Sequence, residues 1–130
     1  MLSYPVITSE PQYAHMPSFE NLLGDKYASC VKAMSLEKQV TKTMPPCFLW
    51  HTAVDATVPL PNSLLMAMSL WQAGVPVELH VFPEGEHYTR EHMEPVTELL
   101  GAAMEQFLQQ QSRQTDEERL KCRYARFRKF

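Results

Sequence analysis

The sequence predicts an α/β fold in which about three mainly parallel strands form a sheet with helices packed on it. Apolar runs of strand length, at residues 47–53 and 77–82, alternate with segments of helical periodicity. Strands separated by helices of this length typically pair in parallel through right-handed crossovers. The 130 residues, of which 45% are hydrophobic and 21% charged, suffice for one globular domain with a modest core.

The first third of the chain combines a short strand with an irregular stretch. Residues 2–8 read LSYPVIT, which is rich in strand-forming types. Pro5 cannot donate a ladder hydrogen bond, so we expect an edge position or a bulge there. Residues 9–44 are interrupted by Pro17 and Gly24, among others, and we expect an irregular helical insert with one or two short helices.

A helix is predicted between the two apolar strands. Asn62 is suited to cap a helix over residues 64–73, and Gly74 is expected to end it as the C′ residue. Three apolar residues recur at helical spacing and are expected to form its apolar face: Leu64, Met68 and Trp71.

The second apolar strand and a last helix complete the elements. In residues 77–82, Val77, Leu79 and Val81 alternate with more polar residues, which predicts one buried and one mixed face. Pro95 suits the first turn of a helix that runs to about Gln111. Its apolar side is expected to consist of Val96, Leu99, Leu100, Ala103, Met104 and Phe107.

Charge and cysteine content exclude several classes of function. The net charge of −3 and the pI of about 5.9 argue against binding of nucleic acid by the whole chain. No apolar run approaches the roughly 20 residues of a membrane helix, and no signal peptide is visible. The cysteines Cys30, Cys47 and Cys122 form no CxxC pair, so neither a disulfide framework nor a zinc knuckle is expected. We expect a cytoplasmic protein that contacts neither membrane nor nucleic acid.

The end of the chain differs in charge from the rest. Residues 1–112 carry a net charge of −7, whereas residues 113–130 carry +4. We therefore divide the chain into a body over 1–112 and a basic tail over 113–130, which we expect to be flexible. Basic and aromatic residues alternate in the tail and could touch RNA or a membrane surface, but a solvated extension is the simpler interpretation.

Two polar residues fall just after the two apolar strands. Asp55 follows residues 47–53, and His87 follows residues 77–82. The carboxyl ends of neighbouring parallel strands open at the same sheet edge, where functional loops gather. A carboxylate there can hold one imidazole nitrogen and leave the other to act as a base. Asp55 and His87 are therefore our candidate catalytic residues, as the acid and base of a Ser-His-Asp triad.

Other polar residues are given structural roles. His87 and His92 are five positions apart, which on a helix separates them by about 140°, so no metal site is expected with Glu91 and Glu94. His51 and His80 lie within strand runs and are taken as structural. Ser63, at a helix start, is not taken as a nucleophile.

The two site loops resemble those of α/β-hydrolase esterases and peptidases. Residues 51–59, HTAVDATVP, resemble the acid loop, and residues 82–87, FPEGEH, resemble the histidine loop. Residues 18–24 and 35–40 look like the inserted region of the acetylesterase and xylan-esterase-like branch. The resemblance covers about residues 2–110 and implies a partial α/β-hydrolase fold. Two departures stand out, because Glu86 and Tyr88 flank the histidine where the family usually has glycines.

The family's nucleophile elbow is absent from these residues. It needs a G-x-S-x-G pattern, and none of the four glycines brackets a serine in this way. In the terms of the resemblance, the chain looks like the C-terminal half of a hydrolase, a truncated fragment with two triad members. We expect an open sheet edge that an N-terminal half completes or through which the chain forms a homo-oligomer.

The resemblance implies a serine-type ester hydrolase for small acyl or acetyl esters, including esters on sugars. In such an enzyme Asp55 orients His87, and no cofactor is needed. The substrate is a small ester if an N-terminal half completes the site. Two alternatives stay open: a non-catalytic remnant or interaction module, and a fragment of a prolyl-oligopeptidase-like peptidase.

Overall fold

The computed structural model describes residues 1–87 and 90–112, with side chains over 1–87 and 98–112. The chain divides into two compact units, Met1–Glu94 and Pro95–Phe130. The predicted tail and Cys122 lie outside the described residues.

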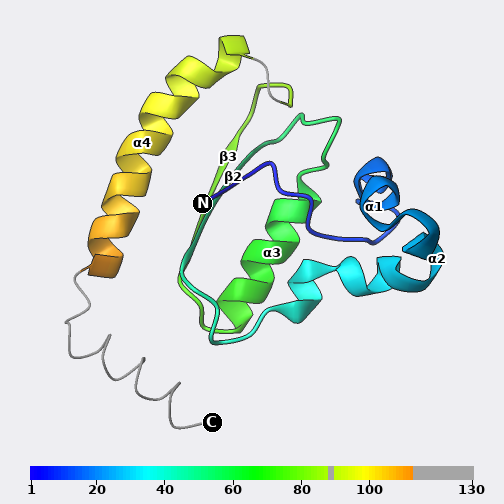
Figure 1. Cartoon of the computed structure of the whole chain (residues 1–130). Coiled ribbons are helices and arrows are strands. Elements are labelled where there is room, and N and C mark those ends of the chain that lie inside the picture. The colour runs from blue at the N-terminus through cyan, green and yellow to red at the C-terminus, as the bar shows by residue number, and fades with distance from the viewer. Residues whose placement is uncertain (88–89, 113–130) are drawn as a thin grey trace, which may run out of the picture. The chain divides into compact units, whose positions relative to one another are not determined.

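A parallel sheet forms the centre of the first unit (Figure 1). It consists of β1 (Leu2–Ser3), β2 (Cys47–Thr52) and β3 (Val77–Phe82), in that spatial order. Leu2 lies opposite Leu49, and residues 47–52 pair in register with residues 77–82. The prediction of about three parallel strands with helices is confirmed.

The strand at the N-terminus is shorter than expected. β1 ends at Ser3, and Tyr4 has a φ of 45°, in the left-handed region that a bulky side chain rarely adopts. The left-handed turn at Tyr4 and the proline after it interrupt the ladder, so the prediction of a strand over residues 2–8 was wrong in length.

Helix α3 (Pro61–Gln72) connects β2 to β3 and ends as predicted. Gly74 has a φ of 71°, its N–H donates to Trp71 O, and the next N–H, of Val75, donates to Leu70 O. These two bonds form a Schellman motif. The start differs from the prediction, because Pro61 opens the helix and Asn62 lies inside it rather than at the cap.

The core lies between the sheet and α3. Its buried apolar cluster consists of Ile7, Leu49, Met66, Leu70 and Val75.

The predicted apolar face of α3 is on the opposite side from this core. Leu64, Met68 and Trp71 have exposed fractions of 46%, 55% and 71%, whereas Met66 and Leu70 are buried. The prediction was wrong because α3 is apolar on more than one side, so periodicity alone could not identify the packed side.

Strand β3 is also less buried than predicted. Val77 and Leu79 pack against the core, but Val81 is exposed. Within the described residues β3 has a neighbouring strand on one side only, so its face is incompletely covered.

The stretch between β1 and β2 is helical but irregular. It contains α1 (Met16–Leu23), α2 (Tyr27–Cys30) and short 3₁₀ turns, which agrees with the expected insert. Phe19 of α1 is buried.

Helix α4 (Arg90–Ser112) supplies the described part of the second unit. It begins five residues before Pro95, so the proline does not mark its first turn. At the sixth position of the helix, Pro95 has no N–H to donate to the carbonyl four residues earlier, so one intrahelical hydrogen bond is missing there. Leu100 and Phe107 are buried as expected, but Leu99 is 64% exposed. Within the described residues, no helix combines the length and the apolar character that crossing a membrane requires.

Candidate active site

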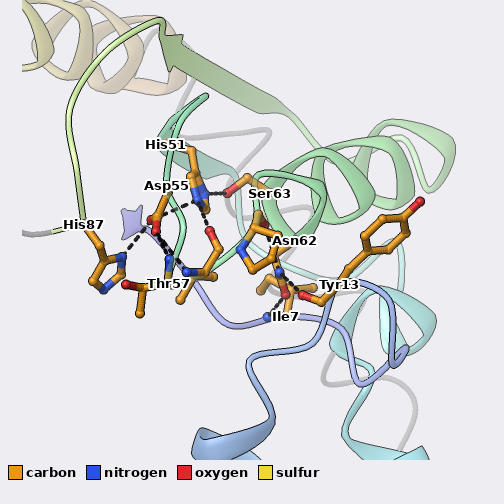
Figure 2. A network of polar contacts seen from close by, with 10 residues as sticks. Ile7, Tyr13, His51, Asp55, Thr57, Asn62, Ser63 and His87 are labelled. Carbon is orange, nitrogen blue, oxygen red and sulfur yellow. Dashed lines mark hydrogen bonds and ion pairs between the residues drawn. The ribbon is translucent and has the colours of Figure 1, made fainter.

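Asp55 lies in the turn directly after β2 and is held there by the backbone of that turn. Its Oδ1 accepts hydrogen bonds from the N–H groups of Thr57 and Val58, each at 2.9 Å. Asp side chains commonly bond to backbone N–H groups a few residues on, which fixes tight turns. The carboxylate is buried, and its second oxygen is thereby directed away from the turn (Figure 2).

His87 meets this second oxygen from the loop after β3. Its Nδ1 lies 2.7 Å from Asp55 Oδ2, although the two residues are 32 positions apart in the sequence. A carboxylate can only accept, so Nδ1 carries the proton and, in the neutral ring, Nε2 is the nitrogen without one. The two candidate residues of the sequence analysis are thus brought together, and about a quarter of the His87 side chain is exposed.

The surroundings of Asp55 favour its charged form. Burial acts to raise its pKa, but hydrogen bonds from His87, Val58 and Thr57 outweigh burial and hold the pKa below its ordinary value of 3.8. Asp55 is therefore ionised at neutral pH and can stabilise a positive charge that develops on His87.

An aromatic residue missing from the sequence prediction, Tyr4, borders the pair and packs on Trp50 of β2. The Tyr4 ring lies 4.9 Å from the His87 ring and 4.4 Å from Trp50, between ring centroids. Burial and the nearby charge of Asp55 raise the pKa of Tyr4. Its unusual positive φ marks a position that local propensity alone does not favour, a feature often found at functional sites.

A second missed residue, Asn62, fastens the loop after β1 to the start of α3. Its Oδ1 accepts from the N–H groups of Ile7 and Thr8 at 2.9 and 3.0 Å. Its Nδ2 donates to the carbonyl groups of Tyr13 and Pro59 (Figure 2). The side chain is fully buried and all its bonding capacity is used. In the sequence, the signal for this role is a polar residue at the start of an apolar helix. The same pattern predicts a helix cap, which is the role that the sequence analysis gives to Asn62.

The remaining candidates lie elsewhere or beyond description. His80 bonds to Glu78 at 2.7 Å on β3 and not to Asp55. Ser63 is fully buried, which agrees with its rejection as a nucleophile. The side chains of Glu91, His92 and Glu94 lie outside the described residues. Across the side chains that the structure describes, no group of three or more His, Cys, Asp or Glu could hold a metal ion.

A cavity of about 260 Å³ is present in the helical insert rather than at the Asp55–His87 pair. It is lined by Ser9, Glu10, Pro11, Met16, Tyr27, Val31, Lys32 and Lys38. The ion pair between Lys38 and Glu10 crosses its edge.

Comparison with known proteins gives one family match. The sequence profile of the prolyl oligopeptidase family matches residues 1–121.

A curated relative is endo-1,4-beta-xylanase B of Butyrivibrio fibrisolvens. The two sequences are 44% identical over 88 residues, which are 67% of this chain and 14% of the relative. This chain therefore spans a small part of that protein's length.

Two solved structures are similar in both fold and sequence. The acetyl ester-xyloside bifunctional hydrolase of Caldicellulosiruptor lactoaceticus superposes with a TM-score of 0.70 at 38% identity, over 82% of this chain and 41% of the other. The carboxylesterase Cest-2923 of Lactobacillus plantarum gives a TM-score of 0.52 at 27% identity, over 66% and 30% of the two chains.

Proposed function

Because the chain belongs to the prolyl oligopeptidase family and has part of the α/β-hydrolase fold of its esterase relatives, we propose that it supplies the acid and base of a serine esterase. Asp55 is the acid and His87 the base. The observation that carries the proposal is the 2.7 Å hydrogen bond from His87 Nδ1 to a carboxylate that the backbone has already fixed.

In the proposed mechanism, Asp55 holds the His87 ring in one tautomer and orientation. Nε2 takes the proton from a serine hydroxyl as the serine attacks the ester carbonyl. The imidazolium formed in this way is stabilised by the Asp55 carboxylate, and it then gives the proton to the departing alkoxide. Water repeats the sequence to release the acid from the acyl-enzyme.

The serine and the oxyanion-hole donors come, in this proposal, from polypeptide outside these 130 residues. The printed sequence contains no G-x-S-x-G pattern. Within the described sheet, β1 pairs with β2 only, so its outer edge can accept a strand of the segment that carries the serine.

Small acyl esters, and acetyl groups on sugars in particular, are the proposed substrates. Support comes from the similar hydrolase of C. lactoaceticus, whose name refers to an acetyl ester and a xyloside. The name of the similar endo-1,4-beta-xylanase B likewise points to substrates that contain xylose.

Peptide hydrolysis is the second candidate, favoured by the name of the matched family. An acid and a histidine loop serve both reactions, since both proceed through an acyl-enzyme. The two activities differ in the bond cleaved, which an ester and an amide substrate separate directly.

A chimera tests the proposal. This chain replaces the matched 41% of the C. lactoaceticus hydrolase. The rest of that protein is to supply the serine and the oxyanion-hole donors. We expect labelling by a fluorophosphonate and hydrolysis of acetyl esters, both lost on His87→Ala. Hydrolysis of dipeptide amides in preference to acetyl esters would favour the peptidase. A folded chimera with neither activity would favour a non-catalytic interaction module.

A further inference from the structure

His51 of β2 lies beside Asp55 and is completely buried. Both of its ring nitrogens have partners. Nε2 lies 2.8 Å from the carbonyl oxygen of Val58 and 3.3 Å from Asp55 Oδ2. Nδ1 lies 2.8 Å from Ser63 Oγ (Figure 2).

These partners select one form of the ring. A carbonyl oxygen only accepts, so Nε2 must carry a proton. Burial lowers the pKa of His51 and outweighs the bond to Val58 and the charge of Asp55, so the ring is neutral at pH 7. Nδ1 then has no proton, and the Ser63 hydroxyl donates to it. The ring is held as the Nε2–H tautomer.

The same Nε2 lies 3.3 Å from Asp55 Oδ2, the oxygen that also receives His87. Asp55 Oδ2 is therefore approached by two imidazoles, from His87 at 2.7 Å and from His51 at 3.3 Å. Val58 joins the same ring of contacts, because its N–H donates to Asp55 Oδ1 and its carbonyl accepts from His51. His51 thus touches both the carboxylate and the turn that carries it.

We propose that His51, held in its Nε2–H tautomer by the Val58 carbonyl, is a positioning residue that fixes the Asp55 carboxylate toward His87. It acts through Asp55 and touches no substrate. Its importance for catalysis rests on the proposed function, but its effect on Asp55 can be measured in this chain with no serine present.

Three variants separate a positioning role from simple core packing. In His51→Gln an amide N–H can take the place of the Nε2–H group. In His51→Leu the volume is roughly kept and both ring nitrogens are lost. Ser63→Ala removes only the hydrogen bond at Nδ1 and leaves Nε2 with its partners.

The readout is nuclear magnetic resonance of the full 130-residue chain. Long-range ¹H–¹⁵N correlation identifies the tautomer of His51, and the ¹³C signal of the side-chain carboxyl follows the titration of Asp55. In the wild type we expect the Nε2–H tautomer alone. His51→Leu should raise the pKa of Asp55, since the polar Nε2–H group beside the carboxylate is lost, and His51→Gln should restore most of the shift.

Ser63→Ala is the matched control, because the Val58 carbonyl still requires the proton on Nε2. We expect this variant to keep the Nε2–H tautomer and the Asp55 titration of the wild type. If the wild type shows the Nδ1–H tautomer, the inference is overturned. If His51→Leu does not fold, His51→Gln decides, since a titration of Asp55 far from that of the wild type would overturn the inference.

The chimera then connects positioning with turnover. We expect His51→Leu to lower kcat about tenfold with little change in KM, and His51→Gln to recover most of the loss, as a misdirected catalytic hydrogen bond acts on the transition state. Equal losses in the two variants would contradict a role through the N–H group. An inactive parent chimera would count against the proposed function and would leave the resonance result on His51 intact.

Discussion

The Tyr4 ring packs against the imidazole of His87, with ring centroids 4.9 Å apart and ring planes inclined by 59°. The same ring contacts Trp50 and His51 of β2, so Tyr4 fills the space between the strand and the candidate base. Its backbone holds a φ of 45°, which costs about 1 kcal/mol or more for a residue other than glycine. Packing around the ring offsets this cost.

Removal of the Tyr4 ring should therefore loosen His87. In the chimera we expect Tyr4→Ala to lower kcat about tenfold, because a poorly aligned hydrogen bond loses about 1 kcal/mol. Tyr4→Phe keeps the ring and should stay close to the wild type. Steady-state ester hydrolysis measures both, and a Phe variant as damaged as the Ala variant would assign the effect to the hydroxyl.

His87 is expected to dominate the activity of any reconstituted enzyme. His87→Ala should lower kcat about 10⁴-fold or more, since triad residues act as a unit. The matched control is His80→Ala, because His80 bonds to Glu78 rather than Asp55. Similar losses in the two variants would argue against the assignment of the base.

The free energy of unfolding should decrease as the pH is lowered, and His51 should contribute to this decrease. Its folded-state pKa is below the ordinary 6.5, so the neutral ring contributes stability that is full above pH 6.5. That contribution is lost as the pH falls through the lower folded-state pKa, by up to about 1.4 kcal/mol per pH unit. Urea unfolding at several pH values between 7.5 and 5 gives the free energy of unfolding at each pH. We expect this free energy to change less with pH in His51→Gln than in the wild type. The same pH dependence in both would contradict a buried neutral ring.

The packed side of α3 can be tested with two identical substitutions. Leu70 is fully buried in the core, whereas Leu64 is 46% exposed. We expect Leu70→Ala to cost about 2–5 kcal/mol of unfolding free energy. Leu64→Ala should cost about 0.5 kcal/mol or somewhat more, in keeping with its partial exposure. Urea unfolding measures the loss of unfolding free energy in both variants. A larger loss in Leu64→Ala than in Leu70→Ala would support the apolar face that the periodicity predicts.

Asn62 should be as important to stability as a large core residue. Asn62→Ala leaves the N–H groups of Ile7 and Thr8 without their acceptor, at a cost of about 2–4 kcal/mol. Asn21→Ala on the exposed surface of α1 is the control and should change stability by about 0.5 kcal/mol at most. Thermal unfolding of the two variants measures the difference.

Local pattern sufficed for the elements of the sheet and for the pair at its edge. The apolar runs of β2 and β3 and the glycine after α3 have strong local signals, and parallel topology places the ends of neighbouring strands together. Asp55 and His87 could be named because each follows such a strand.

The supporting residues could not be found in this way. Asn62 acts mainly through contacts with residues 49 to 55 positions away, whereas His51 and Ser63 bond to each other across 12 positions. Nothing in their immediate neighbours distinguishes the three from ordinary polar residues. Tyr4 depends on a backbone conformation that its own residue type disfavours. The packed side of α3 could not be predicted because apolar residues lie on more than one side of this helix, so their spacing does not single out one face.

The first turn of α3 has a consequence for how the chain folds. Asn62 bonds to backbone groups 54 and 55 positions earlier, and the next residue, Ser63, bonds to His51, 12 positions earlier. The Asn62 contacts form slowly, because a long loop must close before they contribute any stability. We therefore expect Asp55 and His87 to become aligned late in folding. Their alignment follows once the β1–β2 connection has packed against the first turn of α3, which belongs to the β2–β3 connection. A partly folded chain would have its strands and helices and still lack the pair.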